Sequence, residues 1–196
     1  MDCLLLQNRE ILFATDVNEK QFGNELFGVL IKGSDDLILD IDPRQVELVN
    51  GIGSIGVPTH RKKIYDTWTE RGYRFTNVIH PSAIVGRDVE IEAGVQVMAG
   101  AVVQASARLA INSIVNSSAN VDHDCQIGAH CHIAPMAALS GAVTVNCCSH
   151  VGTAAAVIQG ITIGERCVVG AGATVIENLP DDSVVVGTPA KPIRKS

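Results

Sequence analysis

The chain contains a hexapeptide repeat that runs from residue 83 to residue 178. When these residues are written in sixes from Ala83, the third residue of every hexad is aliphatic, sixteen times without an exception, from Val85 to Val175. The first residue of each hexad is never charged or aromatic. A period of six fits neither a helix nor an ordinary strand, whereas it is typical of a parallel β-helix. Three hexads would close one triangular coil with the aliphatic side chains pointing inward. The repeat therefore predicts a little over five coils, stacked over about 25 Å at roughly 4.8 Å per strand layer.

The composition agrees with a narrow β-helix and argues against several kinds of partner. Only 4% of the residues are aromatic, as expected when narrow coils are filled by Val, Ile and Ala. The net charge of -6 is unlike that of a surface for nucleic acid or for an anionic membrane. No apolar run approaches the length of a membrane span, and Leu4 to Leu6 is too short for a signal peptide. We therefore expect a cytoplasmic protein without nucleic-acid or membrane partners.

The six cysteines show no C-x-x-C spacing. Cys125, Cys131 and Cys167 occupy the first position of a hexad, where the coil needs a small apolar side chain. We expect reduced cysteines that serve packing, rather than a disulfide or zinc framework.

Residues 1–80 differ from the repeat, since they hold 21 of the 36 charged residues. The pattern predicts strands over 10–15, 46–49 and 74–79, a short apolar run over 27–31, a short helix capped near 34–36, and an amphipathic helix from Pro58 to about Arg71. Ile64, Tyr65 and Trp68 share the apolar side of that last helix. These elements predict a small α/β domain of Rossmann-like character over residues 1–80, followed by the β-helix domain over 81–196.

Residues 51–56 match the pattern G-x-G-x-x-G between a predicted strand and a predicted helix. Backbone N–H groups in such a loop can receive a phosphate. The other interpretation is a plain tight turn. It is favoured because the helix begins late, at Pro58, and because no acidic residue follows that could hold a ribose.

The coils carry few charged side chains, and two of them flank a histidine. Between residues 93 and 164 the charged residues are Arg108, Asp122 and Asp124, with His123 between the two carboxylates. A carboxylate beside an imidazole fixes its tautomer and raises its basicity, as a general base requires. Both carboxylates fall at a predicted corner of the coil. The alternative is a solvated corner where the D-H-D sequence has no role.

Two further histidines, His132 and His150, are one predicted coil apart and should stack on one face. Stacked histidines raise the possibility of zinc, and a class of zinc carbonic anhydrases uses the same solenoid. That class places two histidine ligands five residues apart, with a third well upstream, and this chain has no such spacing. We therefore predict no metal and a structural role for His150.

After the repeat, residues 179–182 break the pattern and residues 183–187 predict one more strand. The chain then ends in Arg194 and Lys195, which could meet an anionic cofactor or be a solvated tail.

The repeat resembles the hexapeptide-repeat acyltransferases when it is taken with V-D-H-D-C-x-I-G from Val121, H-I-A-P from His132 and V-G-x-P-A-K from Val186. The chain looks most like the bacterial sugar acetyltransferase family that includes sialic acid O-acetyltransferases and UDP-4-amino-sugar N-acetyltransferases. The likeness covers about residues 25–195. It implies a mainly β fold with a left-handed parallel β-helix, acetyl-CoA as co-substrate, and a homotrimer with acetyl-CoA between neighbouring chains.

The resemblance also implies roles for particular residues, which match the family's motif positions. His123 corresponds to the catalytic base and Asp124 to its acidic neighbour. The binding residues that the resemblance implies are Asn116 in the polar substrate pocket, Gly53 near the nucleotide sugar, and His132, Gly141, Thr153 and Ala171 along the acetyl-CoA groove, with the Gly141 N–H suited to the thioester oxygen.

The chain departs from the family at its beginning, because residues 1–10 hold no loop of the form G-x-G-G-H-G. We expect a shortened N-terminal domain that retains acetyl-CoA handling and puts UDP-sugar recognition in question. The leading hypothesis is acetyl transfer to the amine of a UDP-linked sugar in surface glycan biosynthesis. The alternatives are O-acetylation of sialic acid or a related sugar, and a non-catalytic β-helix subunit for binding or assembly.

Overall fold

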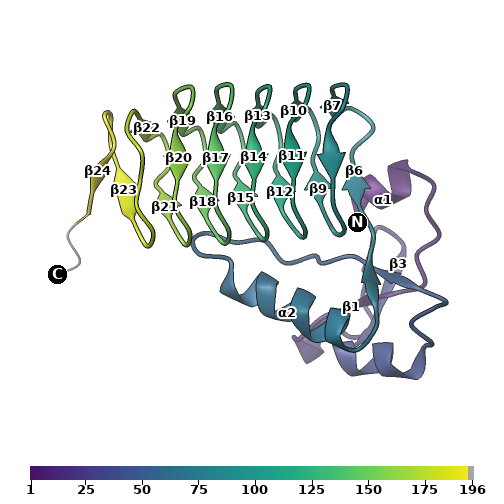
Figure 1. Ribbon diagram of the computed structural model, residues 1–196. Coiled ribbons are helices and arrows are strands. Elements are labelled where there is room, and N and C mark those ends of the chain that lie inside the picture. Colours follow the sequence, from purple (N-terminus) through teal and green to yellow (C-terminus); the bar gives the residue numbers. More distant parts are fainter. Residues whose placement is uncertain (194–196) are drawn as a thin grey trace.

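The computed structural model describes residues 1–193, and most of them form a triangular parallel β-helix (Figure 1). Its three faces are three parallel sheets, in which strands of successive coils pair in register eighteen residues apart, as Ile114 does with His132; the last parallel pair, Val168 with Val184, is sixteen residues apart. Face 1 contains β6 (Val78–Ile79), β9 (Gln96–Val97), β12 (Ile114–Val115), β15 (His132–Ile133), β18 (His150–Val151), β21 (Val168–Val169) and β23 (Val184–Val186), closed by the antiparallel β24 (Lys191–Pro192). Face 2 contains β7 (Ile84–Val85), β10 (Val102–Val103), β13 (Asn120–Val121), β16 (Ala138–Leu139), β19 (Ala156–Val157) and β22 (Thr174–Val175). Face 3 contains β8 (Glu90–Ile91), β11 (Arg108–Leu109), β14 (Gln126–Ile127), β17 (Thr144–Val145) and β20 (Thr162–Ile163). The coil predicted from the period of six is confirmed.

The aliphatic residues fill the interior of the coils. The third-position residues from Val97 to Val175 are at most 1% exposed, as are the first-position cysteines Cys125, Cys131 and Cys167. Their burial confirms the packing role predicted for these cysteines. Val85 is an exception, since it is 38% exposed at the end of the stack where the first coil has no coil before it.

Each hexad ends in a corner whose last residue adopts the left-handed backbone conformation. This holds for fifteen of the sixteen hexads, with φ between 53° and 73°, and only four of those residues are glycines. The N–H of this residue donates to a carbonyl of the preceding coil, as Asp124 does to Ala105 over 3.1 Å. These inter-coil hydrogen bonds repeat along each corner and offset the cost of the left-handed conformation. We name the corners by the faces they join: corner 1–2, corner 2–3 and corner 3–1.

The N-terminal part forms two small sheets instead of one continuous layer. Its elements are α1 (Asp2–Leu6), β1 (Ala14–Thr15), the 3-10 helix η1 (Glu19–Gln21), β2 (Glu25–Leu26), β3 (Val29–Gly33), the 3-10 helix η2 (Asp35–Asp40), β4 (Glu47–Leu48), α2 (Thr59–Glu70) and β5 (Arg74–Phe75). One sheet has the order β1-β3-β2, with β2 antiparallel to β3, and the other is the parallel pair β4-β5.

Several predictions for this part are corrected in detail. The strand predicted over 10–15 shrinks to β1, and the predicted helix near 34–36 is a 3-10 helix whose Ser34 makes no side-chain capping bond. The strand predicted over 74–79 divides into β5 and β6, because β6 pairs with β9 of the coil. The helix predicted from Pro58 is confirmed as α2. The division into domains 1–80 and 81–196 stays a prediction.

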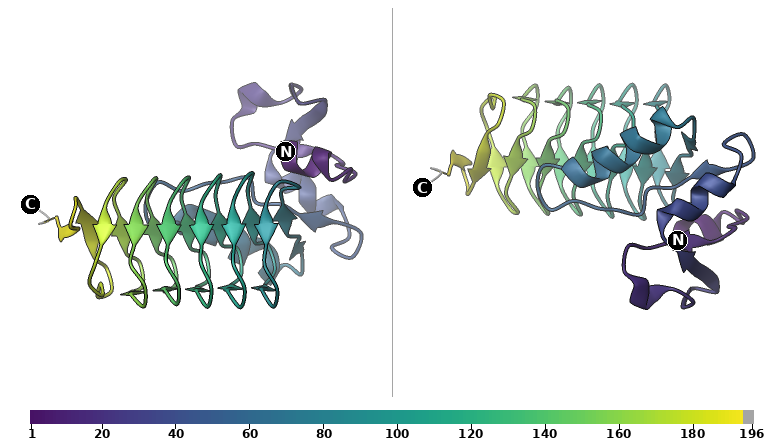
Figure 2. Two further views of the ribbon diagram at one scale, coloured as in Figure 1. Left: turned by 90° about the horizontal axis from the view of Figure 1, so that it is seen from above. Right: turned by 90° about the horizontal axis from the view of Figure 1, so that it is seen from below.

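Helix α2 runs alongside the coils rather than at their end (Figure 2). Its buried Tyr65 stacks on Phe75 with ring centroids 4.7 Å apart, and both side chains reach the first coil at Gly94, where a Cβ would lie 2.9 Å from the Tyr65 ring and 3.1 Å from the Phe75 Cβ. Trp68 packs edge-on against Tyr73 at 5.2 Å. This aromatic cluster fixes the helix to the β-helix by apolar contact.

The segment between β4 and α2 follows face 1 from coil to coil. Its Asn50 carbonyl accepts a hydrogen bond from Gln96 in β9 over 2.7 Å, and Ser54 reaches His132 in β15. Gly51, Gly53 and Gly56 have no left-handed φ, and a Cβ on any of them would meet nothing within 4 Å. Residues 51–56 contain no hydrogen-bonded turn, so the tight turn favoured for them is wrong; the segment is an irregular connection that bends at residues 55–57.

The C-terminal predictions are partly tested. The predicted strand over 183–187 is confirmed as β23, whereas Arg194 and Lys195 lie outside the described residues. Among residues 1–193, no helix has the length and apolar character to cross a membrane.

Candidate active site at two corners of the coil

His123 lies at corner 2–3 with its ring about half exposed. Its Nδ1 is 2.7 Å from Asp124 Oδ2, and its backbone N–H donates to Asp122 Oδ1 over 2.7 Å. Because a carboxylate can only accept, Nδ1 carries the proton and the Nε2 lone pair is left free. The two carboxylates of the D-H-D sequence therefore have different roles: Asp124 orients the ring, and Asp122 holds the backbone.

The charges around His123 make its imidazole more basic. The hydrogen bond to Asp124 is the largest cause of a pKa raised above the usual 6.5, and the charge of Asp122 adds to it. A more basic imidazole with a free Nε2 suits a group that accepts a proton from a substrate.

Gly141 occupies the same corner one coil later, directly against the His123 ring. A Cβ at position 141 would lie 2.5 Å from His123 Nε2 and 2.6 Å from Cε1. Among the residues that the structure describes, nothing accepts a hydrogen bond from the Gly141 N–H. The coil therefore presents a free lone pair and a free backbone donor side by side at corner 2–3.

The other predicted pocket residues gather around His132 on face 1. His132 Nε2 lies 2.9 Å from Asn116 Nδ2, and its Nδ1 lies 2.9 Å from Ser54 Oγ and 3.0 Å from the Ser54 carbonyl. These partners are consistent with one tautomer, in which Nδ1–H donates to the Ser54 carbonyl and Nε2 accepts from the Asn116 amide.

His132 is a buried neutral imidazole. Burial is the main reason that its pKa falls to about 4, and the neighbouring His150 lowers it further. The two rings meet edge-on with centroids 5.0 Å apart, which confirms the predicted stacking. Within residues 1–193, no group of three or more His, Cys, Asp or Glu side chains comes together in a way that could hold a metal ion.

The remaining predicted residues line corner 1–2 and its approach. Thr153 and Ala171 are exposed and occupy equivalent positions in successive coils, joined by a hydrogen bond from the Gly172 N–H to the Thr153 carbonyl. Gly53 is exposed and directly precedes Ser54. This surface therefore adjoins the His132 cluster.

One chain does not bring all the predicted residues together. His123, Asp124 and Gly141 lie at corner 2–3, whereas Asn116, Thr153 and Ala171 lie at corner 1–2, and face 2 separates the two corners (Figure 1). The candidate site within one chain consists of two halves.

Sequence reasoning missed two residues of the second half. Arg61 on α2 is only 1% exposed and donates to the carbonyls of Asn50, Ile52 and Asn112 over 2.7–3.2 Å. It holds the segment that carries Ser54. A signal for Arg61 was present, because its spacing to Tyr65 and Trp68 places it on the buried side of the helix. Ser54 gave no signal, since its partner His132 is 78 residues away in the chain.

Comparison with known proteins places this geometry in a family. No family model matches the chain. Among solved structures, PerB from Caulobacter crescentus, in complex with CoA and GDP-perosamine, is 34% identical with a TM-score of 0.84, and the match covers 98% of this chain and 89% of PerB. The acetyltransferase domain of PglB from Neisseria gonorrhoeae, in complex with acetyl coenzyme A, is 34% identical with a TM-score of 0.88, over 98% and 91% of the two chains. The chain belongs to the hexapeptide-repeat sugar acetyltransferases.

Other matches agree with this membership. WeeI from Acinetobacter baumannii, 22% identical over 92% of this chain and 85% of WeeI, with a TM-score of 0.76, supports the fold alone. The fold is the left-handed parallel β-helix of these acetyltransferases, as the resemblance implied. Two further structures of the Caulobacter enzyme carry one histidine replaced by asparagine or by alanine, both with CoA and GDP-perosamine.

Proposed function

We propose that this acetyltransferase moves the acetyl group of acetyl-CoA onto the amine of a nucleotide-linked sugar, with His123 as general base. The observation that carries the proposal is the His123–Asp124 pair, whose free Nε2 lies against Gly141. Membership of the family supports the co-substrate, because its relatives at 34% identity bind CoA or acetyl-CoA.

The proposed chemistry needs one group that accepts a proton and one group that donates a hydrogen bond to the oxyanion. The sugar amine attacks the thioester carbonyl while Nε2 of His123 takes its proton, so that a C–N bond forms and a tetrahedral oxyanion develops. The free N–H of Gly141 is suited to donate to that oxyanion. Collapse then breaks the C–S bond, and the imidazolium returns its proton to the CoA thiolate. General base catalysis of this kind contributes about 10²–10⁴-fold to a rate.

The proposal also concerns the nucleotide to which the acceptor sugar is linked. The Caulobacter relative binds GDP-perosamine, an amino sugar on GDP, whereas the sequence motifs favoured a UDP-linked sugar. The exposed Gly53 beside Ser54 is the proposed approach of that sugar. The predicted cytoplasmic location stays a prediction.

We further propose a homotrimer in which each active site is shared between neighbouring chains. The two halves of the candidate site lie at different corners of one chain, so a neighbour could supply Asn116 and His132 to the His123 of the next chain. Closed threefold symmetry would give three identical sites. Co-expression tests this arrangement: His123→Ala and Asn116→Ala chains, each inactive alone, should regain activity when mixed, since some sites then contain both intact halves. Equal inactivity of the mixture would contradict a shared site.

The function is tested by the mass of the product after incubation with acetyl-CoA and a panel of UDP- and GDP-linked amino sugars and free sialic acids. A gain of one acetyl group on an amino sugar is expected with the wild-type chain, with a loss of about 10²-fold or more in His123→Ala. His60→Ala, which replaces an exposed histidine of α2, is the matched control and should keep full activity.

Acetylation of sialic acid hydroxyls alone would favour the O-acetyltransferase alternative. If the chain bound neither acetyl-CoA nor a sugar, the remaining interpretation would be the non-catalytic β-helix subunit for binding or assembly.

A further inference from the structure

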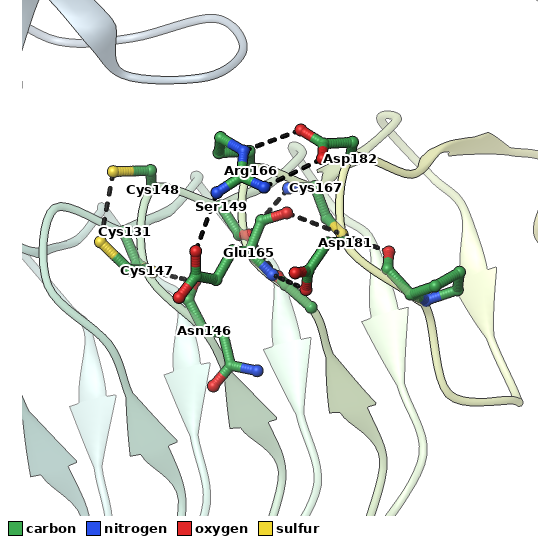
Figure 3. Close-up of polar contacts among 12 residues, drawn as sticks. Cys131, Asn146, Cys147, Cys148, Ser149, Glu165, Arg166, Cys167, Asp181 and Asp182 are labelled. Atoms are coloured by element: carbon green, nitrogen blue, oxygen red, sulfur yellow. Dashed lines mark hydrogen bonds and ion pairs between the residues drawn. The ribbon is translucent and has the colours of Figure 1, made fainter.

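Cys147 and Cys148 form a pair of thiols at corner 3–1 that the proposed reaction does not use. Their sulfur atoms are 3.3 Å apart (Figure 3). Both cysteines are partly exposed, whereas Cys3, Cys125, Cys131 and Cys167 are buried. The pair therefore differs from the packing cysteines in both position and access.

The coil itself explains why the two sulfurs meet outside the core. The residues occupy the fifth and sixth positions of a hexad, and Cys148 has the left-handed φ of 61° that the sixth position adopts throughout. Glu165 and Arg166 occupy the same positions one coil later, where Arg166 bonds to Glu165 and Asp182 (Figure 3). Partial burial is the main cause that raises the pKa of the Cys148 thiol, to about 12, and Lys62 of α2 is near enough to oppose it electrostatically. The pair thus lies in a polar, partly exposed setting that needs no apolar filling.

A disulfide between these cysteines fits the geometry poorly. Neighbouring residues joined by a trans peptide have Cα atoms about 3.8 Å apart, below the separation of roughly 4.4–6.8 Å found in ordinary disulfides. Closing the bond would require the sulfurs to approach by more than 1 Å, and strain of this kind makes a disulfide easy to reduce.

A single atom inserted between the sulfurs fits better. Two bonds of about 2.3 Å, the length of a zinc–thiolate bond, span roughly 3.3–3.8 Å when the angle between them lies near 92–110°. The observed distance of 3.3 Å between the two sulfur atoms lies at the lower end of this range, so the backbone would not have to move. Zinc itself would need four ligands, and the described part of the chain offers no group of three or more suitable side chains. The atom bound here must therefore bond to the two sulfurs only, and its remaining substituents must belong to the ligand itself.

We propose that Cys147 and Cys148 form a dithiol site for trivalent organoarsenicals. With an arsenoxide R–As=O, both S–H bonds and the As=O bond break, two As–S bonds form, and the oxygen leaves as water with the two thiol protons. Arsenic stays trivalent, so that no oxidant or reductant is required. The site does not depend on the proposed acetyl transfer.

Phenylarsine oxide tests the site on the full-length protein in the presence of an excess of a monothiol. Intact mass should show one phenylarsenic group bound per chain with the loss of two hydrogens, and a small dithiol should remove it. Cys147→Ser and Cys148→Gly should each weaken binding by about 10²-fold or more, because the second bond is then no longer intramolecular. Cys148→Gly is chosen because glycine accepts the left-handed φ of this position and should fold. Cys3→Ser is the control and should bind as the wild type does.

Two results would overturn the proposal. One is unchanged binding in both single-site variants, with circular dichroism showing that they are folded. The other is no binding to the folded wild-type chain at a slight excess of arsenical.

Discussion

The imidazole of His123 lies against the backbone of Gly141 so closely that a Cβ at position 141 would stand 2.5 Å from Nε2. Eighteen residues separate the two in sequence, but they occupy the same place in successive coils. The repeat therefore does more than build a scaffold, because it places a free backbone N–H beside the proposed base. A side chain at position 141 would have to displace the imidazole.

Gly141→Ala should reduce acetyl transfer with little effect on folding. The three atoms nearest to its Cβ all belong to the ring of His123, which is half exposed and can swing away. We expect kcat/KM to fall by about 10²-fold, since general base catalysis needs the ring in position. Steady-state kinetics and urea unfolding measure the two effects.

Gly128→Ala provides the contrast. A Cβ there would meet the backbone of the next coil, 2.8 Å from the Cys147 N and 2.9 Å from the Val145 carbonyl oxygen. We expect a loss of about 1–3 kcal/mol in the free energy of unfolding. Equal loss of stability in both variants would contradict the assignment of Gly141 to the site.

Asp124→Asn should move the acid limb of the pH–rate profile to lower pH. The carboxylate of Asp124 is the main cause of the raised pKa of His123, and the reaction requires the neutral ring. The wild-type rate should therefore rise with a midpoint above 6.5, and the midpoint of the variant should fall back toward 6.5. The plateau should drop by roughly tenfold, as the imidazolium loses its partner. Asp122→Asn should shift the midpoint less, and an unchanged midpoint in Asp124→Asn would show that another group titrates.

Stability should decrease as the pH falls from 6.5 to 4, because His132 is buried in its neutral form. In this range the unfolded chain binds a proton at His132, whose usual pKa is 6.5, while the folded chain, with a pKa of about 4, does not. The free energy of unfolding should fall by up to about 3 kcal/mol from this residue. His150, whose pKa burial also lowers, adds in the same direction.

Urea unfolding of wild type and His132→Gln at pH 7 and pH 4.5 measures the contribution of His132. Glutamine cannot take up a proton, so the variant should show a smaller difference between the two conditions. The same difference in both proteins would mean that His132 is not the titrating group.

Arg61→Met should loosen the segment that carries Ser54. The substitution leaves the carbonyls of Ile52 and Asn112 without their buried donor, while the Asn50 carbonyl keeps only its hydrogen bond from Gln96; the loss should cost about 2–4 kcal/mol of stability. Hydrogen exchange should increase over residues 50–57 more than in the coils. Lys63→Met, on the exposed side of α2, is the control. Uniform destabilisation without a local increase would contradict the clamping role.

The local parts of the site could be predicted from the sequence. His123 and Asp124 are adjacent, so their hydrogen bond follows from the corner geometry that the repeat imposes. The in-register pairing of His132 with His150 follows from their spacing of one coil in the same way. The contacts of Ser54 and Arg61 could not be predicted, because each depends on how a segment without periodicity packs on the coils.

The sequence by itself determined the β-helix, since an uninterrupted period of six can bury its aliphatic side chains only when three hexads close one coil. It also indicated His123 as the proposed base and Asp124 as its carboxylate. Only the tertiary structure decided that the predicted site residues divide between two corners, and that Gly53 belongs to an irregular segment without a hydrogen-bonded turn. The repeat determines on which face, corner and coil each of its residues lies. The path of residues 50–58 instead depends on hydrogen bonds from Arg61 and Gln96 that no local pattern encodes.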